Sequence, residues 1–410
     1  MWKGLLIFHL KMALRKLPLD SLTIKIGKSG LERRKMDIDK LFEFQECDDG
    51  YILSSFKSEN DPSVTEVVIP PEYKGKPVIS IGHNAFSWTD DLRAVKIPDG
   101  VTKIESCAFE YCENLETVIL PDSLKVIGDN AFCGCAVLDN ITFPKELEKI
   151  EEDAFCSCER LSSVILPDSL KRLEKYAFFG CLELTSVVLS EGLTEISENV
   201  FDSCGDLGTI VLPDSIRNIG KFAFSESDLT SIKFSPQLES IGEGAFFDCY
   251  LSSVTFPPTL KKIGRKAFSS CRFLEKVDFG DSTPLLERGV FNNCPKLGAE
   301  NIVQGLACSA DISQPFQPCD DFDLDRALRE DVFVLAMKYD SFALFDKDEI
   351  LLEIAGHGMT KYLPWTEDAG WTFTKESVEK ALDISTQKGF VETTAWLLDY
   401  KKRKYGFDEV

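Results

Sequence analysis

The stretch Leu115–Cys135, "LETVILPDSLKVIGDNAFCGC", is one period of a repeat that occupies more than half of this 410-residue chain. Its Ala131-Phe132 pair belongs to a series of Ala-Phe or Val-Phe pairs. The phenylalanines of the series are Phe86, Phe109, Phe132, Phe155, Phe178, Phe201, Phe224, Phe246, Phe268 and Phe291. Successive members are 23 residues apart, except for two consecutive steps of 22. Because chance similarity does not keep one phase over so many copies, the pattern predicts an array of stacked structural repeats.

The other positions of the period follow the frame L-x-x-V-x-L-P-x-x-L-x-x-I-x-x-x-A-F-x-x-C-x-x. Its first part, L-x-x-V-x-L, ends in alternating apolar positions and is closed by a proline, which cannot continue a strand ladder. We therefore expect a short strand followed by a turn. One such unit is too small to bury its own apolar side chains. The units must stack, each strand pairing in parallel with the next.

Two periods, "LETVILPDSLKVIGDNAFCGC" and "LSSVILPDSLKRLEKYAFFGC", resemble the BspA-like (Treponema-type) leucine-rich repeats, a bacterial subclass with a proline after the strand and "AF..C" on the return limb. The resemblance covers about residues 64–297. It implies an α+β repeat fold, a curved leucine-rich-repeat solenoid with a parallel concave sheet of about ten 22–23-residue repeats.

Residues 37–80 are predicted to form an N-terminal cap and a first repeat. Two alternating runs in "FEFQECDDGYILSSF" flank Asp48-Asp49-Gly50, which is a β-hairpin turn signal. The following "VVIPPEYKGKPVISIGHNAF" resembles a repeat lengthened by residues 72–76. We expect the hairpin to cover the exposed edge of the first strand. The leucine-rich repeats proper are assigned to residues 81–298.

Residues 1–36 carry nine Lys or Arg and only two acidic residues. Their apolar run, Gly4–Leu10, is too short to span a bilayer, and no small-residue cleavage site follows, so a secretory signal is not expected. Three interpretations remain open for this basic tail: disorder, a true start at Met36, or a membrane-surface helix. Contact with a membrane is expected only in the last case.

The chain has a net charge of −22 and is 44% hydrophobic. A protein that binds the nucleic-acid backbone needs a basic face to release counterions, so no nucleic-acid partner is expected. The acidic balance fits either a cationic partner or a solvated surface without a partner.

Eight of the 14 cysteines occupy one position of the frame, three residues after the phenylalanine. They are Cys112, Cys135, Cys158, Cys181, Cys204, Cys249, Cys271 and Cys294. Ser227 and Thr89 fill the same position elsewhere, which indicates a packing slot for small side chains. Disulfides between adjacent turns are the first alternative. A zinc site is the second, although zinc needs four converging ligands and these residues form a line. Cys133 and Cys156 lie outside this ladder, so a disulfide or reactive thiol is to be sought there.

The residues that flank the central valine of each strand are predicted to point onto the concave sheet. They form one track of mainly small polar side chains and one that is aliphatic in its middle. The candidate binding residues are Thr117, Ile119, Asn140, Thr142, Ser163, Ile165, Ser186, Val188, Thr209, Val211, Ser231 and Lys233. Exposed aliphatic groups offer area for a partner to bury. The alternative is that β-branched residues serve only as strand formers. The family resemblance favours binding, because leucine-rich repeats bind proteins or peptides on this surface.

After Leu297 the frame stops, and residues 299–320, with two prolines and no period, are assigned to a linker. Residues 321–410 change to helical spacing and are assigned to a small all-α C-terminal module. The segment "SVEKALDISTQKGFVETTAWLLDYKKRKYG" predicts two helices, the first closed by Gly389 and the second running from Val391 to about Arg403. Their spacing resembles the helix pair of an ankyrin repeat, although no Thr-Pro-Leu-His segment precedes it. The alternative is a helical cap on the last strand.

The sequence contains no glycine-rich phosphate loop, His-Glu-x-x-His, Gly-x-Ser-x-Gly or paired metal carboxylates. His357 is predicted on a loop between helices, and no nucleophile or orienting group lies near it in the sequence. No cofactor, metal or catalytic residue is therefore expected. The first candidate function is a non-enzymatic scaffold that binds a protein or peptide on the concave sheet. The second is an effector or enzyme whose activity resides in residues 321–410, with the repeats selecting the target.

The cysteine content and the family resemblance give different expectations for the compartment. Many unpaired thiols and the lack of a visible signal favour the cytoplasm. The resemblance implies the cell surface or secretion, because many BspA-like proteins are exported.

Overall fold

The computed structural model describes residues 38–57, 64–282, 284–287, 289–297, 302–303, 347–358, 360, 363–368 and 371–406. Within them lie two hydrophobic cores, one in the hairpin and repeats and one in the C-terminal helices. The basic tail of residues 1–36 lies outside the described residues, as does the linker of residues 299–320 apart from residues 302–303.

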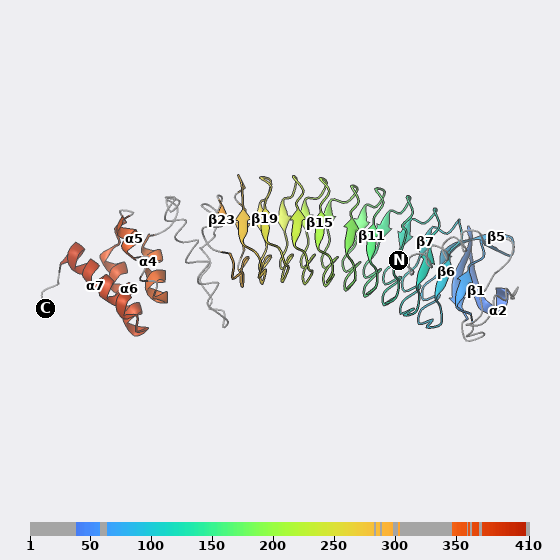
Figure 1. Ribbon diagram of the computed structural model, residues 1–410, viewed down its shortest axis with the longest axis horizontal. Coiled ribbons are helices and arrows are strands. Elements are labelled where there is room, and N and C mark those ends of the chain that lie inside the picture. Colours follow the sequence, from blue (N-terminus) through green and yellow to red (C-terminus); the bar gives the residue numbers. More distant parts are fainter. Residues whose placement is uncertain are drawn as a thin grey trace.

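The predicted N-terminal hairpin is confirmed. A short helix α2 (Ile38–Leu41) leads into β1 (Phe42–Cys47), which pairs antiparallel with β2 (Gly50–Phe56). Strand β2 then pairs in parallel with β5 (Lys76–Ile81), which is preceded by β4 (Glu72–Tyr73). The hairpin therefore covers one edge of the stack, at the blue end of Figure 1.

The strands expected from L-x-x-V-x-L form a parallel ladder along the stack, named here the long-strand ladder (Figure 1). Its members are β3 (Glu66–Val68), β6 (Ala94–Lys96), β8 (Thr117–Ile119), β11 (Ser163–Ile165), β13 (Ser186–Val188), β15 (Thr209–Val211), β17 (Ser231–Lys233), β19 (Ser253–Thr255), β21 (Lys276–Asp278) and β23 (Ile302–Val303). Asn140 bridges β8 to β11 without forming a strand of its own. The last strand, β23, lies in the segment assigned above to the linker and pairs in parallel with β21.

A second parallel ladder of two-residue strands, interrupted between β12 and β14, runs along the return limb, and the sequence did not predict it. Its members are β7 (Lys103–Ile104), β9 (Val126–Ile127), β10 (Lys149–Ile150), β12 (Arg172–Leu173), β14 (Glu195–Ile196), β16 (Asn218–Ile219), β18 (Ser240–Ile241), β20 (Lys262–Ile263) and β22 (Leu285–Leu286). The hairpin joins this ladder through β5, which pairs with β7, so the edge that it covers belongs to the return limb. The ladder keeps its register across both 22-residue steps, from Asn218 to Ser240 and on to Lys262.

The core between the two ladders is centred on the repeated phenylalanines. Their rings stack along the axis with adjacent centroids 4.8–5.8 Å apart. This spacing matches the separation of neighbouring strands, so each repeat places its ring on the ring of the previous repeat. The regular spacing of phenylalanines in the sequence therefore corresponds to a continuous buried column of stacked rings.

The eight cysteines of the frame form a second buried column, and the packing interpretation is confirmed. Each thiol donates a hydrogen bond to the backbone carbonyl of the preceding repeat's phenylalanine, over 3.0–3.4 Å. All cysteines of the described residues are free thiols. Burial raises the pKa of Cys112 to about 12, and it raises the pKa of Cys135 well above its usual range. Cys112 and Cys135 are therefore protonated, and their hydrogen bonds fix the direction of each thiol.

The described part of the C-terminal module is helical. It contains α4 (Lys347–His357), α5 (Leu363–Asp368), α6 (Lys375–Gln387) and α7 (Val391–Tyr405). Gly389 follows α6 with a φ of 73°, as predicted for a C′ residue. His357 was expected on a loop but is the last residue of α4, because the buried face formed by Leu351 and Ile354 carries the helix through to that point. None of the helices in the described ranges is both long and apolar enough to cross a membrane.

Candidate binding surface

Four consecutive long strands present a row of hydroxyls, exposed except for the half-buried Ser163, beside an exposed aliphatic row, and the two rows are named here the hydroxyl–aliphatic strip. Its members are Ser163, Ile165, Ser186, Val188, Thr209, Val211, Ser231 and Lys233, on β11, β13, β15 and β17. The side chains of Ile165, Val188 and Val211 are 67%, 51% and 60% exposed. They alternate with core residues such as Val164 and Ile210, as expected for strands that are buried on one face.

The strand register places hydroxyl side chains next to hydroxyl side chains and, in β11 and β13, aliphatic next to aliphatic. Ser163 pairs with Ser186 and Ile165 with Val188 across β11 and β13. Thr209 pairs with Ser231 and Val211 with Lys233 across β15 and β17. One edge of the strip is therefore lined by hydroxyl groups that both donate and accept hydrogen bonds, and the other edge offers apolar area that ends at a lysine.

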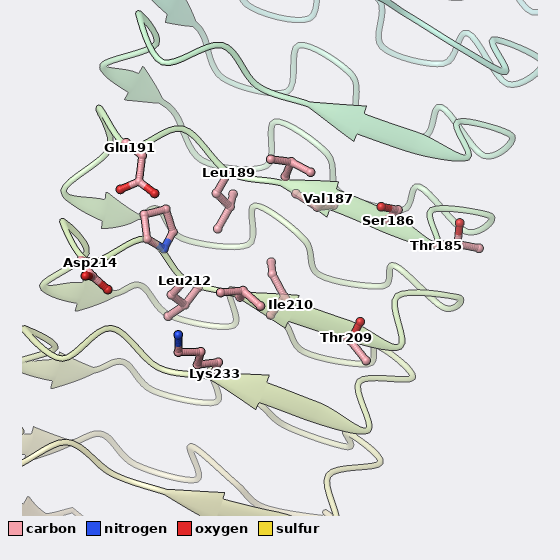
Figure 2. A pocket seen from close by; sticks show the side chains of 13 residues that line it. Thr185, Ser186, Val187, Leu189, Glu191, Thr209, Ile210, Leu212, Asp214 and Lys233 are labelled. Atoms are coloured by element: carbon pink, nitrogen blue, oxygen red, sulfur yellow. The ribbon is translucent and has the colours of Figure 1, made fainter.

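The long-strand ladder is interrupted between β13 and β15, in the middle of the strip, and again between β17 and β19. Within the described residues, no backbone hydrogen bond joins Ser186–Val188 to Thr209–Val211. A groove with a volume of about 480 Å³ lies over this break and is shown in Figure 2. It is lined by Thr185, Ser186, Val187, Val188, Leu189, Glu191, Thr209, Ile210, Val211, Leu212, Pro213, Asp214 and Lys233. This volume falls in the range of sites that hold a side chain or a small ligand.

The turn that leaves β13 differs from the other turns at this groove. In the frame, a proline follows the last apolar residue of the strand. After Leu189 this position is occupied by Ser190, whose hydroxyl donates to the backbone carbonyl of Leu170 over 2.9 Å. The Ser190 hydroxyl also accepts from the backbone N–H of Gly192 over 3.0 Å. Ser235 replaces the proline in the same way after β17, and its hydroxyl makes a similar pair of hydrogen bonds, so the missing proline does not by itself mark the groove.

One end of the groove is acidic. Glu191 and Asp214 are exposed and lie on the same side of it, with Lys233 on the adjoining strand (Figure 2). Within the described part of the chain, neither carboxylate forms an ion pair. A cationic group on a bound segment would therefore find two carboxylates free to accept hydrogen bonds.

The remaining predicted site residues are less accessible, and one prediction is wrong. Thr117 is only 5% exposed, so it does not offer its hydroxyl to a partner. It lies between Ala94, which is also buried, and Asn140, which is partly buried. Ile119 is also partly buried, whereas Thr142 is exposed but belongs to no strand. The accessible strip therefore begins at β11.

The sequence analysis missed an aromatic pair formed by the exposed Trp88 and the half-buried Tyr111. The rings of Trp88 and Tyr111 stack with centroids 4.4 Å apart, and both residues have positive φ, of 59° and 53°. They occupy the frame position two residues after the phenylalanine, where φ is positive in every repeat and where glycine, serine or asparagine is common. A bulky residue is unusual in that conformation, so the aromatic residues at this frame position were the sequence signal that could have revealed the pair.

The C-terminal module shows no comparable site in the part that the structure describes. The described residues hold no group of three or more His, Cys, Asp or Glu side chains arranged for a metal ion. The core of the module is closed by Tyr400, whose hydroxyl accepts from the backbone N–H of Phe373 over 3.2 Å. Val391 and Leu398 lie exposed on α7. The resemblance to an ankyrin repeat stays a prediction.

Comparison with known proteins agrees with this architecture. The family model described as the BspA type leucine rich repeat region, in six copies, matches residues 79–208 and 194–308. No curated protein sequence matches the chain.

Solved structures of bacterial leucine-rich repeat proteins are similar to this chain. A leucine-rich repeat protein from Bacteroides ovatus is 26% identical over 69% of this chain and 70% of its own, with a TM-score of 0.56. The T. pallidum leucine rich repeat protein is 32% identical over 46% of this chain and 86% of its own, with a TM-score of 0.43.

Proposed function

The chain belongs to the BspA-type leucine-rich repeat family, and on that basis we propose that it is a non-enzymatic scaffold that binds a protein or peptide on the hydroxyl–aliphatic strip. Repeat solenoids typically bind their partners on extended surfaces formed by successive repeats. The strip is such a surface, because four repeats contribute to it at equivalent positions.

The exposure of Ile165, Val188 and Val211 carries the proposal. Strand formation alone does not require aliphatic side chains there, since other repeats have Lys96, Thr255 and Asp278 at the same frame position. Adjacent aliphatic groups that remain exposed are instead typical of a surface that a partner covers.

The groove indicates the chemistry of the partner. We propose an extended segment that places an aliphatic side chain against Val188 and Val211 and a cationic group near Glu191 and Asp214. The hydroxyls of Ser186 and Thr209 can then bond to polar groups of the bound backbone. The net charge of −22 supports a cationic partner, because long-range attraction raises the rate of encounter.

The test is affinity capture from a lysate of the native host, followed by quantitative mass spectrometry. The wild-type chain is compared with the double variant Ile165→Glu, Val188→Glu. We expect the double variant to lose the captured partner while its unfolding curve stays unchanged, because both side chains are exposed.

The matched control is Val391→Glu with Leu398→Glu, which adds the same charge to two exposed aliphatic positions on α7. This control should capture the partner as well as the wild type does. Loss of capture in the control but not in the strip variant would assign binding to the C-terminal module and contradict the proposal.

Family membership supports a position at the cell surface or in the medium. The free thiols do not contradict this, because the cysteines of the frame are fully buried and an external oxidant cannot reach them. Labelling of intact cells with a membrane-impermeant amine reagent tests the assignment. Labelling only after cell lysis would contradict it.

A further inference from the structure

Cys133 and Cys156 occupy the same frame position in adjacent repeats, one residue after the stacked phenylalanines. Two backbone hydrogen bonds hold their turns together on either side of Cys133. The N–H of Phe132 donates to the carbonyl of Ala154, and the N–H of Gly134 donates to the carbonyl of Cys156, each over 2.8 Å. Turns in such contact lie about 5 Å apart, which is within the Cα separation that a disulfide requires.

The two thiols lie on neighbouring turns and are the more accessible cysteines at this level of the stack, where the frame cysteines Cys135 and Cys158 are fully buried. The Cys156 sulfur lies 3.6 Å from the Ser157 hydroxyl, and Cys133 is the strongest influence on the Cys156 thiol. The frame cysteines, in contrast, donate to phenylalanine carbonyls. Cys271 and Cys294 are also neighbours in the stack, but both are fully buried and donate to phenylalanine carbonyls. Cys156 is partly exposed and Cys133 is 8% exposed, so a small reagent can reach this pair.

We infer that Cys133 and Cys156 form a redox-active dithiol, which a low-molecular-weight disulfide oxidises to a disulfide between adjacent repeats. Cys156 is the attacking thiol, because it is the more exposed of the two. Cys133 is the resolving thiol.

The electrostatics agree with these roles. The hydrogen bond from Cys133 is the largest influence on Cys156 and lowers the pKa of Cys156 to about 7, against the effect of burial. The same hydrogen bond and burial raise the pKa of Cys133. Cys156 is thus partly thiolate at neutral pH, while Cys133 holds the proton.

The exchange balances in two steps. The Cys156 thiolate attacks one sulfur of the small disulfide, so that a mixed disulfide forms and the other half leaves as a thiolate, which takes the proton of Cys133. The Cys133 sulfur then attacks the Cys156 sulfur, and the second half leaves as a thiolate. Two protein sulfurs lose two electrons, and one disulfide molecule becomes one thiol and one thiolate.

The experiment uses the reduced full-length chain and oxidised glutathione at neutral pH. We expect the intact mass to fall by about 2 Da, the mass of two hydrogen atoms. Tryptic peptides 126–145 and 150–160 should become linked, and fragmentation should place the bond at Cys133 and Cys156, since each peptide also contains a frame cysteine.

Three variants assign the roles. Cys133→Ser should stop at the glutathione adduct of Cys156, because the resolving thiol is missing. Cys156→Ser should give neither the adduct nor the link. Cys107→Ser, which removes another partly exposed thiol, should react as the wild type does. Circular dichroism confirms that each variant is folded.

Other outcomes overturn the inference. A reduced pair in the wild type after prolonged exposure would show that the thiols cannot reach bonding geometry. A link between Cys271 and Cys294, or an adduct on Cys107 in place of Cys156, would show that neither exposure nor the shared hydrogen bond selects the reactive thiol.

Discussion

The ring of Phe56 lies 5.0 Å from the ring of Phe86, centroid to centroid, with an angle of 23° between the ring planes. Phe56 belongs to the hairpin and has no place in the repeat frame, yet it continues the column of stacked phenylalanines by one member. The hairpin therefore closes the core as well as the edge of a sheet. A repeat array needs such a terminal unit, because its last repeat otherwise exposes an apolar face.

Phe56→Ala should destabilise the chain by about 3–5 kcal/mol, because it removes a buried ring and uncovers one face of Phe86. Urea denaturation followed by circular dichroism measures the change. Phe44→Ala is the control, since Phe44 lies on the same hairpin but is partly exposed and stacks on Tyr73 instead. Equal losses in the two variants would show that Phe56 does not act as the end of the column.

Cys135→Ser should cost less stability than Cys135→Val, although valine is the more apolar residue. Cys135 donates to the carbonyl of Phe109, and serine keeps a donor: Ser227, which fills this slot in another repeat, donates to the carbonyl of Phe224 in its own repeat. Valine loses that bond and adds volume to a closed site, which together cost about 1–3 kcal/mol. Denaturant unfolding of both variants decides the point. A more stable valine variant would mean that the slot selects only for apolar character.

Ile165→Asp and Val164→Asp should have very different effects on the free energy of unfolding, although the residues are neighbours in the sequence. Ile165 is exposed, so its replacement should change the free energy of unfolding by less than about 0.5 kcal/mol. Val164 is fully buried, and a carboxylate there has no partner, so that variant should unfold or aggregate. Expression and thermal melting test the pair. A strong loss in Ile165→Asp would show that the aliphatic row belongs to the core.

Cys156 should be alkylated by iodoacetamide with a rate that rises through a midpoint near pH 7, because its pKa is lowered to about 7. The pKa of Cys107 is raised to about 11, chiefly by burial, so its rate should still be rising well above that pH. At pH 7, Cys156 should react on the order of a hundredfold faster, after allowing for its weaker intrinsic nucleophilicity.

Cys133→Ala is the control for this pH profile. It removes the hydrogen bond that stabilises the thiolate, so the midpoint for Cys156 should move to higher pH. Site-resolved mass spectrometry gives both profiles. An unchanged midpoint in Cys133→Ala would assign the lowered pKa to another cause.

Much of the fold could be predicted from this sequence because repeats interact with their immediate neighbours at a fixed offset. The same offset sets the phenylalanine column, the cysteine slot and the outward row that includes Ile165 and Val188. The hairpin was predictable for a different reason, since Asp48-Asp49-Gly50 is a local turn signal between alternating strands. The two-residue strands of the return limb were not predictable, because a strand such as Lys149–Ile150 is too short to show a period.

The sequence by itself thus determined the repeat, the parallel strands and which side chains alternate between core and surface, because alternation follows from backbone geometry within each strand. Only the tertiary structure decided that Thr117 is covered while Thr209 is open, since exposure depends on the surrounding elements. It also decided that the long-strand ladder breaks between β13 and β15 and between β17 and β19, and that hydrogen bonds join the turns of Cys133 and Cys156. Those features depend on hydrogen bonds between repeats, which a one-dimensional pattern does not record.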